Sequence, residues 1–509
     1  MAPASPGWRP GSSPHGADPD AADSPPPVDW EEYFQRAGRT RIVIRSPGEG
    51  PQLAQRKLLA KKQILYKKSH KSSPETTMPE RRVILVLPTQ EALHDSAMMR
   101  LSGGSGIARR LTGLPARAEI DTGFSPVPLG DSQSGSPFSV SSPDGASHYA
   151  VRATIDAGAE LPALTTEGAA IFSDPPIAHF AAPAGAPGGT RVEVEQRLGV
   201  SGLAARRLDG AGVAIAVVDG GINLAHLAAR DVAASLDATL SWPPRPVEAG
   251  HHPVGPGTMC AYGALIAAPR ATLLDLPVLP AAGPGFLSDA LQAYAHLLAV
   301  VRADKPRFKA LVVTNSWGLG HESWDFPPGH PGRYVDNPGH PFNRIVGALS
   351  RYGVDILFAA GNDGPEFRAP LGGRDGPRSR ATIMGANAHP DVITVTGATL
   401  RGRLSGDALQ GPGIPGMVYA KPDLASYTDF LGSEAGGPGK ADAGTSAACP
   451  VAAGCVAALR TRLPHAALNP RDLTVALQAD ANRRGPSSWH HSLGYGVMAP
   501  LRTAMRLGL

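Results

Sequence analysis

The feature that most constrains the fold is an alternation of apolar strands and helices that begins near residue 195. The run A-G-V-A-I-A-V-V (211–218) is uninterrupted and rich in β-branched residues, as a strand buried on both faces requires. Helices over 289–302 and 344–352 are each followed by a strand, over 309–314 and 354–360. This alternation predicts an α/β domain with a mostly parallel central sheet.

A different pattern precedes this domain. Apolar runs predict strands over 83–88, 119–124, 148–156 and 169–177, with helices over 91–101 and 160–166. The order β-α-β-β-α-β is that of a small α+β, ferredoxin-like unit. We therefore expect an α+β domain at 73–180, a Pro/Gly-rich linker at 181–194 and the α/β domain at 195–509.

Residues 1–72 are predicted to be a disordered, basic N-terminal region. The start of the chain lacks the apolar core of a signal peptide, and no run of about 18 apolar residues could span a membrane. We therefore expect a cytoplasmic protein that binds no membrane. The net charge of +4 gives no reason to expect a nucleic-acid partner.

The three cysteines, Cys260, Cys449 and Cys455, are odd in number and lie in apolar segments. They predict buried thiols rather than disulfides or a zinc site. No acidic loop indicates a calcium site, and we expect neither a metal nor a cofactor.

Three polar residues stand where an α/β fold places its functional groups, beyond the carboxyl ends of strands or at the start of a helix. Asp219 directly follows the strand over 211–218, where a buried acid can orient a neighbouring base. Asn362 leaves the strand over 354–360 into a glycine turn and could donate to an oxyanion. Ser446, in G-T-S-A-A-C-P, begins a helix whose free N–H groups favour negative charge.

Taken in order, V-V-D-G-G-I-N, N-S-W-G (315–318), A-A-G-N-D-G, K-P-D-L (421–424), G-T-S-A-A-C-P and G-Y-G (494–496) resemble the subtilisin-like serine proteases, the subtilases. The resemblance covers roughly residues 195–505 and implies a three-layer subtilisin-like domain. It implies that Ser446 is the nucleophile, Asp219 the orienting acid and Asn362 the oxyanion donor. It further implies that Ser316, Trp317 and Gly318 form the edge that pairs with an extended substrate. The unit at 73–180 is similar to the family's inhibitory propeptide.

The family's catalytic histidine motif, H-G-T-x-x-A-G, aligns with P-G-T-M-C-A-Y-G, so that Pro256 occupies the histidine position. Proline suits the first position of a helix but cannot accept a proton from serine. His251, His252 and His321 are the candidate substitutes. Gly220 also replaces the usual Ser or Thr after the acid.

These residues predict a serine endopeptidase that is weak or inactive, and they leave open a peptide-binding pseudoprotease or scaffold with an intact substrate groove. A change of histidine to proline in an otherwise active enzyme is the third reading. The expected partners are a peptide or protein substrate and the chain's own propeptide-like domain. Because self-cleavage needs a base, we expect the linker to remain uncut.

Overall fold

The computed structural model describes residues 80–88, 118–129, 148–156, 170–180, 185–242, 247–281, 283–303, 307–320, 322–362, 383–406, 408–483 and 488–509. Residues 1–72 lie outside these ranges, as do the predicted helices over 91–101 and 160–166. All the elements below belong to one compact unit, Met78–Leu509.

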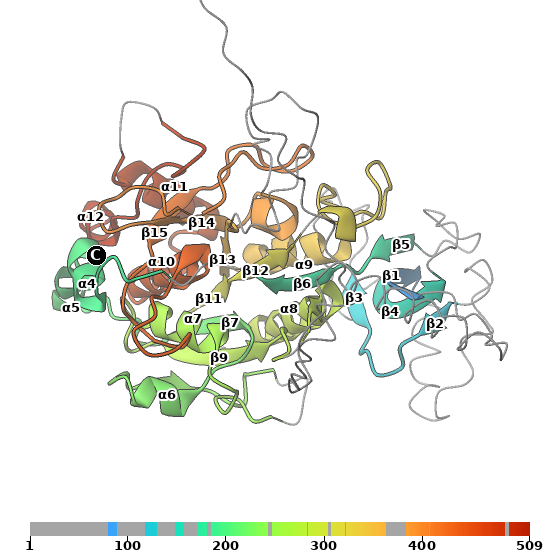
Figure 1. Cartoon of the computed structure of the whole chain (residues 1–509), viewed down its shortest axis with the longest axis horizontal. Helices are drawn as coiled ribbons and strands as arrows, with labels where there is room; N and C mark the ends of the chain where they lie inside the picture. The colour runs from blue at the N-terminus through green and yellow to red at the C-terminus, as the bar shows by residue number, and fades with distance from the viewer. Residues whose placement is uncertain are drawn as a thin grey trace, which may run out of the picture. The chain divides into compact units, whose positions relative to one another are not determined.

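A seven-stranded parallel sheet forms the centre of this unit, in the order β15-β14-β13-β11-β7-β9-β8 (Figure 1). Its strands are β7 (Val213–Asp219), β8 (Ser235–Leu236), β9 (Thr272–Pro277), β11 (Ala310–Asn315), β13 (Asp355–Ala359), β14 (Ile393–Ala398) and β15 (Leu424–Tyr427). The predicted α/β class and the predicted parallel sheet are confirmed.

Helices cover both faces of this sheet. The described helices are α4 (Arg191–Leu198), α5 (Val200–Ala205), α6 (Leu224–Ala228), α7 (Pro256–Ala264), α8 (Leu287–Arg302), α9 (Pro341–Arg351), α10 (Gly444–Arg460), α11 (Pro470–Asp480) and α12 (Pro500–Arg506), with 3₁₀ turns at Glu322–Trp324 and Gly385–Ala388. Alternate residues of β7 face opposite sides: Val213, Ile215 and Val217 pack with α7 and α10, whereas Ala214, Ala216 and Val218 pack with α8 and α9. The two layers of helices therefore enclose two separate apolar cores.

The upstream strands form an antiparallel sheet in the order β2-β4-β1-β5, and β3 also pairs with β4. They are β1 (Glu80–Pro88), β2 (Glu119–Ile120), β3 (Val127–Leu129), β4 (His148–Asp156) and β5 (Ala170–Ser173). The strands predicted over 83–88 and 148–156 are confirmed, whereas the strand predicted over 119–124 is limited to Glu119–Ile120 and β3 was not predicted. A complete ferredoxin-like unit stays a prediction because its helices fall outside the described residues.

The predicted strand over 169–177 is wrong in one respect, because it divides into two strands that belong to different sheets. After β5, the chain turns at Asp174 and Pro175 and enters β6 (Pro176–His179). Strand β6 pairs antiparallel with β10 (Gly285–Phe286) and β12 (Trp317–Leu319), which both belong to the α/β domain. The Asp-Pro-Pro turn redirects the chain, so its apolar character continues while its hydrogen-bond partners change.

A buried ion pair links α10 to the central sheet. Arg460, on α10, donates two hydrogen bonds to the carboxylate of Asp355 on β13, at 2.6 and 2.7 Å, and both side chains are fully buried. Cys260, Cys449 and Cys455 are buried free thiols, as predicted, and burial raises the pKa of Cys449 and of Cys455 to about 12.

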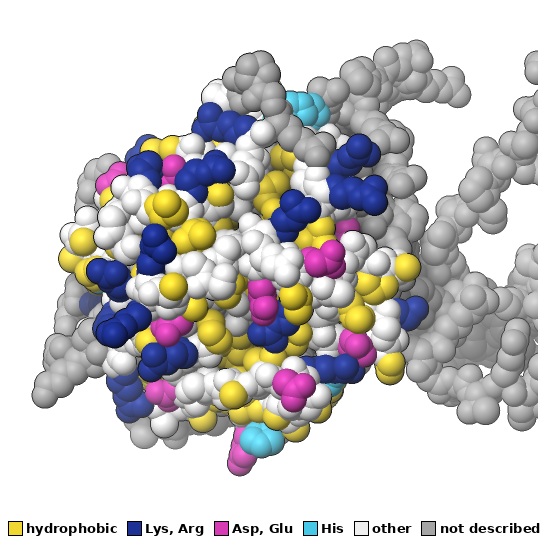
Figure 2. Space-filling view, turned by 90° about the vertical axis from the view of Figure 1, so that its left-hand side faces the viewer, with side chains coloured by type: hydrophobic (Ala, Val, Ile, Leu, Met, Phe, Trp, Pro, Cys, Tyr) yellow, Lys and Arg dark blue, Asp and Glu magenta, His cyan; other side chains and the backbone are white. Residues whose placement is uncertain are grey.

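The surface over α4, α5 and α12 carries lysine and arginine side chains spread among acidic and hydrophobic ones (Figure 2). Among the described residues, no helix is both long and apolar enough to cross a membrane. The cytoplasmic location stays a prediction.

Candidate active site

Asp219 is the last residue of β7 and is fully buried at the carboxyl edge of the parallel sheet. Its Oδ1 accepts the backbone N–H of Gly220 at 2.7 Å and lies 2.7 Å from Nε2 of His179. Its Oδ2 accepts a weak hydrogen bond from the thiol of Cys260 at 3.6 Å. The acid predicted from the sequence is therefore paired with an imidazole, and that imidazole belongs to β6.

The environment of His179 sets its protonation. Burial of the ring disfavours the imidazolium, but the charge and the hydrogen bond of Asp219 outweigh this effect and raise the pKa of His179. A carboxylate only accepts hydrogen bonds, so the neutral ring carries its proton on Nε2 and keeps a lone pair on Nδ1. The ring lies against the backbone of Gly220, where a Cβ would stand 3.3 Å from Cε1 of His179.

Ser446 lies in the first turn of α10 and is buried. Its Oγ donates to the carbonyl oxygen of Ser316 at 3.3 Å, a long hydrogen bond. Ser316 Oγ in turn donates to the carbonyl oxygen of Ser446 at 3.0 Å. These reciprocal contacts hold the start of α10 against the segment that leads into β12.

Asn362 follows β13 at the same edge of the sheet. Its Oδ1 accepts the N–H of Thr445 at 2.9 Å and the hydroxyl of Thr445 at 3.0 Å. These two bonds fix the orientation of the amide, and Nδ2 donates to the carbonyl oxygen of Phe180 at 3.3 Å. Asn362 therefore binds Thr445, the residue before Ser446, through Oδ1 and the carbonyl oxygen of Phe180 through Nδ2.

The predicted substrate edge is occupied by the chain itself. In the register of β6 on β12, Trp317 pairs with His179, Gly318 with Ala178, and Leu319 with Ile177. The indole of Trp317 is buried and donates to the carbonyl oxygen of Val218 at 2.9 Å, which anchors the strand to the central sheet. Ser316 lies just before the paired strand, so the paired edge is Trp317–Leu319.

The ring of Phe180 lies against two glycines. A Cβ at Gly318 would stand 2.4 Å from its Cζ, and a Cβ at Gly361 would stand 3.5 Å from its Cε1. Gly361 also has φ +109°, a conformation that side-chain-bearing residues rarely adopt. The missing side chains leave room for an aromatic ring beside the Asn362 amide.

Pro256 is the first residue of α7, as its sequence context predicts. The helix packs closely on its neighbours: a Cβ at Gly257 would stand 2.4 Å from the carbonyl oxygen of Gly221, and one at Gly454 of α10 would stand 2.2 Å from that of Ala264. Helix α7 is thus packed closely against α10, the helix that bears Ser446.

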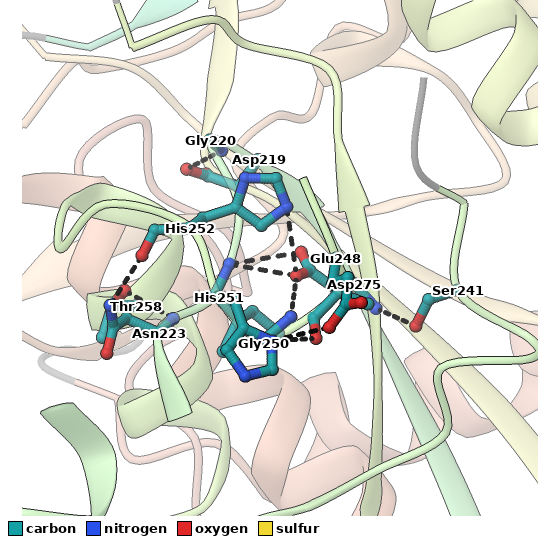
Figure 3. Close-up of polar contacts among 12 residues, drawn as sticks. Asp219, Gly220, Asn223, Ser241, Glu248, Gly250, His251, His252, Thr258 and Asp275 are labelled. Carbon is teal, nitrogen blue, oxygen red and sulfur yellow. Dashed lines mark hydrogen bonds and ion pairs between the residues drawn. The ribbon is translucent and has the colours of Figure 1, made fainter. Parts of the chain in front are cut away.

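Two of the histidines proposed as substitutes, His251 and His252, lie beside the carboxylates of Glu248 and Asp275 (Figure 3). His252 is buried with Nε2 3.6 Å from Oδ2 of Asp275, and its ring lies on the backbone of Gly221. The side chain of His251 is 69% exposed and faces Glu248. His321 lies outside the described residues.

The imidazole of His179 was missed from the sequence because it belongs to a different predicted domain, before the linker. The sequence contains the pair His-Phe at the end of an apolar run, and this pair could have drawn attention to the site. The pair indicates a function only once β6 is known to pair with β12. Among the described residues, no cluster of three or more His, Cys, Asp or Glu is arranged to hold a metal ion.

Comparison with known proteins agrees with the motif order. The model of the subtilase family (peptidase S8) matches residues 210–496, more than half of the chain. Similar solved structures include MycP1 from the ESX-1 type VII secretion system (16% identity, TM-score 0.43, 65% of this chain and 90% of that chain) and MycP1 from Mycobacterium smegmatis (16%, 0.42, 65% and 90%). A third is the MycP3 protease from the type VII (ESX-3) secretion system (18%, 0.42, 65% and 92%). No curated protein matches the chain. The family match over the parallel sheet and all three polar motifs shows that this chain belongs to the subtilase family.

Proposed function

We propose that the chain is a serine endopeptidase of the subtilase type whose α/β domain carries a nucleophile and an oxyanion donor but no base of its own. In this proposal Ser446 attacks a peptide carbonyl, Asn362 holds the developing oxyanion, and Asp219 orients an imidazole. Pro256 occupies the family's histidine position.

The observation that carries the proposal is the way β6 is held. An extended segment pairs with β12, and the carbonyl oxygen that follows it accepts from Asn362 Nδ2 at 3.3 Å. Strand addition with a carbonyl at the oxyanion donor is how a peptidase presents a scissile bond. The residues at 73–180 are accordingly proposed to act as the chain's propeptide.

The missing base limits activity on ordinary substrates. In subtilisin, loss of the base lowers turnover by roughly 10⁶-fold, whereas the remaining site still contributes about 10³–10⁴ over water. Pro256 therefore favours, as a second candidate, a pseudoprotease that binds extended peptides without cutting them.

A fluorophosphonate probe, which reacts with activated serines, tests the proposal. Wild type should be labelled weakly. The variant Pro256→His with His179→Ala places an imidazole on α7 and frees Asp219 to orient it, so labelling of Ser446 and casein hydrolysis should rise by at least about 10³-fold. Adding Ser446→Ala should abolish both. A folded double variant that is neither labelled nor active would refute the endopeptidase proposal and leave the pseudoprotease.

A further inference from the structure

We propose that the peptide bound in the groove supplies the missing base: His179 accepts the proton of Ser446, and the chain cuts itself once, after Phe180. Peptides admitted later are cut only if they bring a histidine to the same place, directly before an aromatic residue at the scissile bond. This inference rests on the proposed function and names its substrate class.

The first support is the geometry of two consecutive residues. His179 and Phe180 end an extended segment, so their side chains point to opposite sides. The imidazole contacts Asp219 at 2.7 Å, while the ring of Phe180 lies on Gly318. The carbonyl between that ring and the next residue is the one held by Asn362.

The nucleophile belongs to the same cluster. Thr445, directly before Ser446, donates both of its hydrogen bonds to Asn362 Oδ1, and Ser446 Oγ donates to the carbonyl of Ser316, directly before β12. These contacts join the start of α10, which bears the hydroxyl, to Asn362 and to the residue before β12, the strand with which β6 pairs. The long bond from Ser446 Oγ leaves the hydroxyl free to rotate to a better acceptor.

The second support is the space around Asp219. Proline at 256 brings no competing imidazole to the carboxylate. Gly220 has no side chain beside the ring of His179, and a Cβ at this position would stand only 3.3 Å from Cε1 of that ring. Pro256 and Gly220, the two departures from the family pattern, both leave space for an imidazole from a bound peptide beside Asp219.

The chemistry balances with the groups present. Ser446 Oγ adds to the carbonyl carbon of Phe180 as its proton passes to Nδ1 of His179, and Asn362 Nδ2 donates to the oxyanion. The bond to residue 181 then breaks, and the imidazolium returns the proton to the leaving amine. Water hydrolyses the ester with His179 again as base, which leaves a carboxylate on Phe180 and a free Ser446.

This arrangement predicts that the site loses its base after a single cut. When the cut segment leaves, its imidazole leaves with it, and the α/β domain retains only Pro256 at the helix start. In this proposal the chain is cut at the start of the linker, whereas the sequence alone led us to expect an uncut linker.

The test follows the intact mass of the purified full chain with time. Wild type should yield fragments 1–180 and 181–509 at a first-order rate that does not depend on protein concentration. Ser446→Ala should abolish the break, and His179→Gln should slow it by at least about 10²-fold. His251→Ala, at an exposed ring, is the matched control and should cut at the wild-type rate.

Two readouts separate a base from a residue that only holds β6 in place. Imidazole added to His179→Ala should restore part of the cutting. His179→Ala with Pro256→His should also cut, because the base now stands on α7. A wild-type chain that stays whole while this double variant is labelled by the fluorophosphonate would overturn the inference and spare the proposed function. His179→Gln cutting at the wild-type rate would also overturn it. Failure of the folded double variant to be labelled would overturn both.

The substrate class is tested on the cut protein. The peptide Pro-Ile-Ala-His-Phe-Ala-Ala should be hydrolysed at least about 10²-fold faster than its counterpart with Gln in place of His. Equal rates, or hydrolysis of neither peptide, would overturn that part of the inference.

Discussion

The contact between Gly318 and Phe180 allows the free energy that keeps β6 in its place to be measured without any catalysis. In Gly318→Ala, the added Cβ would stand 2.4 Å from Cζ of Phe180, so the ring must retreat by at least about 1 Å to reach ordinary contact. The ring is only partly buried in the wild type. Complete burial of a phenylalanine contributes about 1.5–3 kcal/mol, so we expect displacement to cost about 1 kcal/mol.

That cost should appear as more frequent opening of β6. Amide hydrogen exchange of the segment 174–180, measured by mass spectrometry in a Ser446→Ala background that keeps the chain whole, should be roughly fivefold faster in Gly318→Ala. Gly406→Ala is the control, since nothing lies within 4 Å of a Cβ at Gly406. Unchanged exchange in Gly318→Ala would show that Phe180 does not occupy this place, and the peptide-groove argument would fail with it.

Three further outcomes follow from the site and the core. Asn362→Ala should slow self-cleavage by about 10²–10³-fold without preventing folding, as judged by intact mass and by thermal unfolding; a change below threefold would remove Asn362 from the oxyanion site. Asp355→Ala leaves the guanidinium of Arg460 buried without its carboxylate and should lower the free energy of unfolding by about 3–5 kcal/mol, measured by urea titration; a loss below 1 kcal/mol would contradict the pairing. The cutting rate should fall as the pH drops through the pKa of His179, because the imidazolium cannot accept a proton. Since Asp219 raises that pKa, the half-maximal rate should lie above pH 6.5, and a midpoint below pH 6 would refute the contact.

The docking of β6 should weaken as the pH rises, because His179 loses its positive charge. The pKa of His179 is raised in the folded chain, so the ion pair with Asp219 is fully present below the ordinary value of about 6.5 and is lost as the pH rises through the raised pKa. In the proposed mechanism, the ion pair is therefore strongest at the pH values where His179 cannot act as base, and we expect cutting at the higher pH values where the ion pair weakens.

The sequence by itself determined the alternation of strands and helices in the α/β domain and most of the polar groups of the site. Uninterrupted β-branched runs such as 211–218 have few alternatives to a buried parallel strand, and the polar residues that end such strands must meet at one edge of the sheet. Asp219 and Asn362 could be singled out on these grounds and Ser446 by its place at the start of a helix, and the resemblance to the subtilases then suggested their roles. The place of Pro256 at the start of a helix also follows from local rules, because the missing N–H of proline has no partner there in any case.

Only the tertiary structure decided which imidazole meets Asp219. His251 and His252 lie near Pro256 along the chain, yet His252 faces Asp275 and His251 faces solvent. His179 reaches the carboxylate because the Asp-Pro-Pro turn after β5 sends the chain onto β12. Hydrophobic periodicity and secondary-structure propensity depend on residues a few positions apart, whereas this contact joins segments from two predicted domains. The position of His179 is fixed by backbone hydrogen bonds between β6 and β12, and such bonds do not depend on particular side chains in β6.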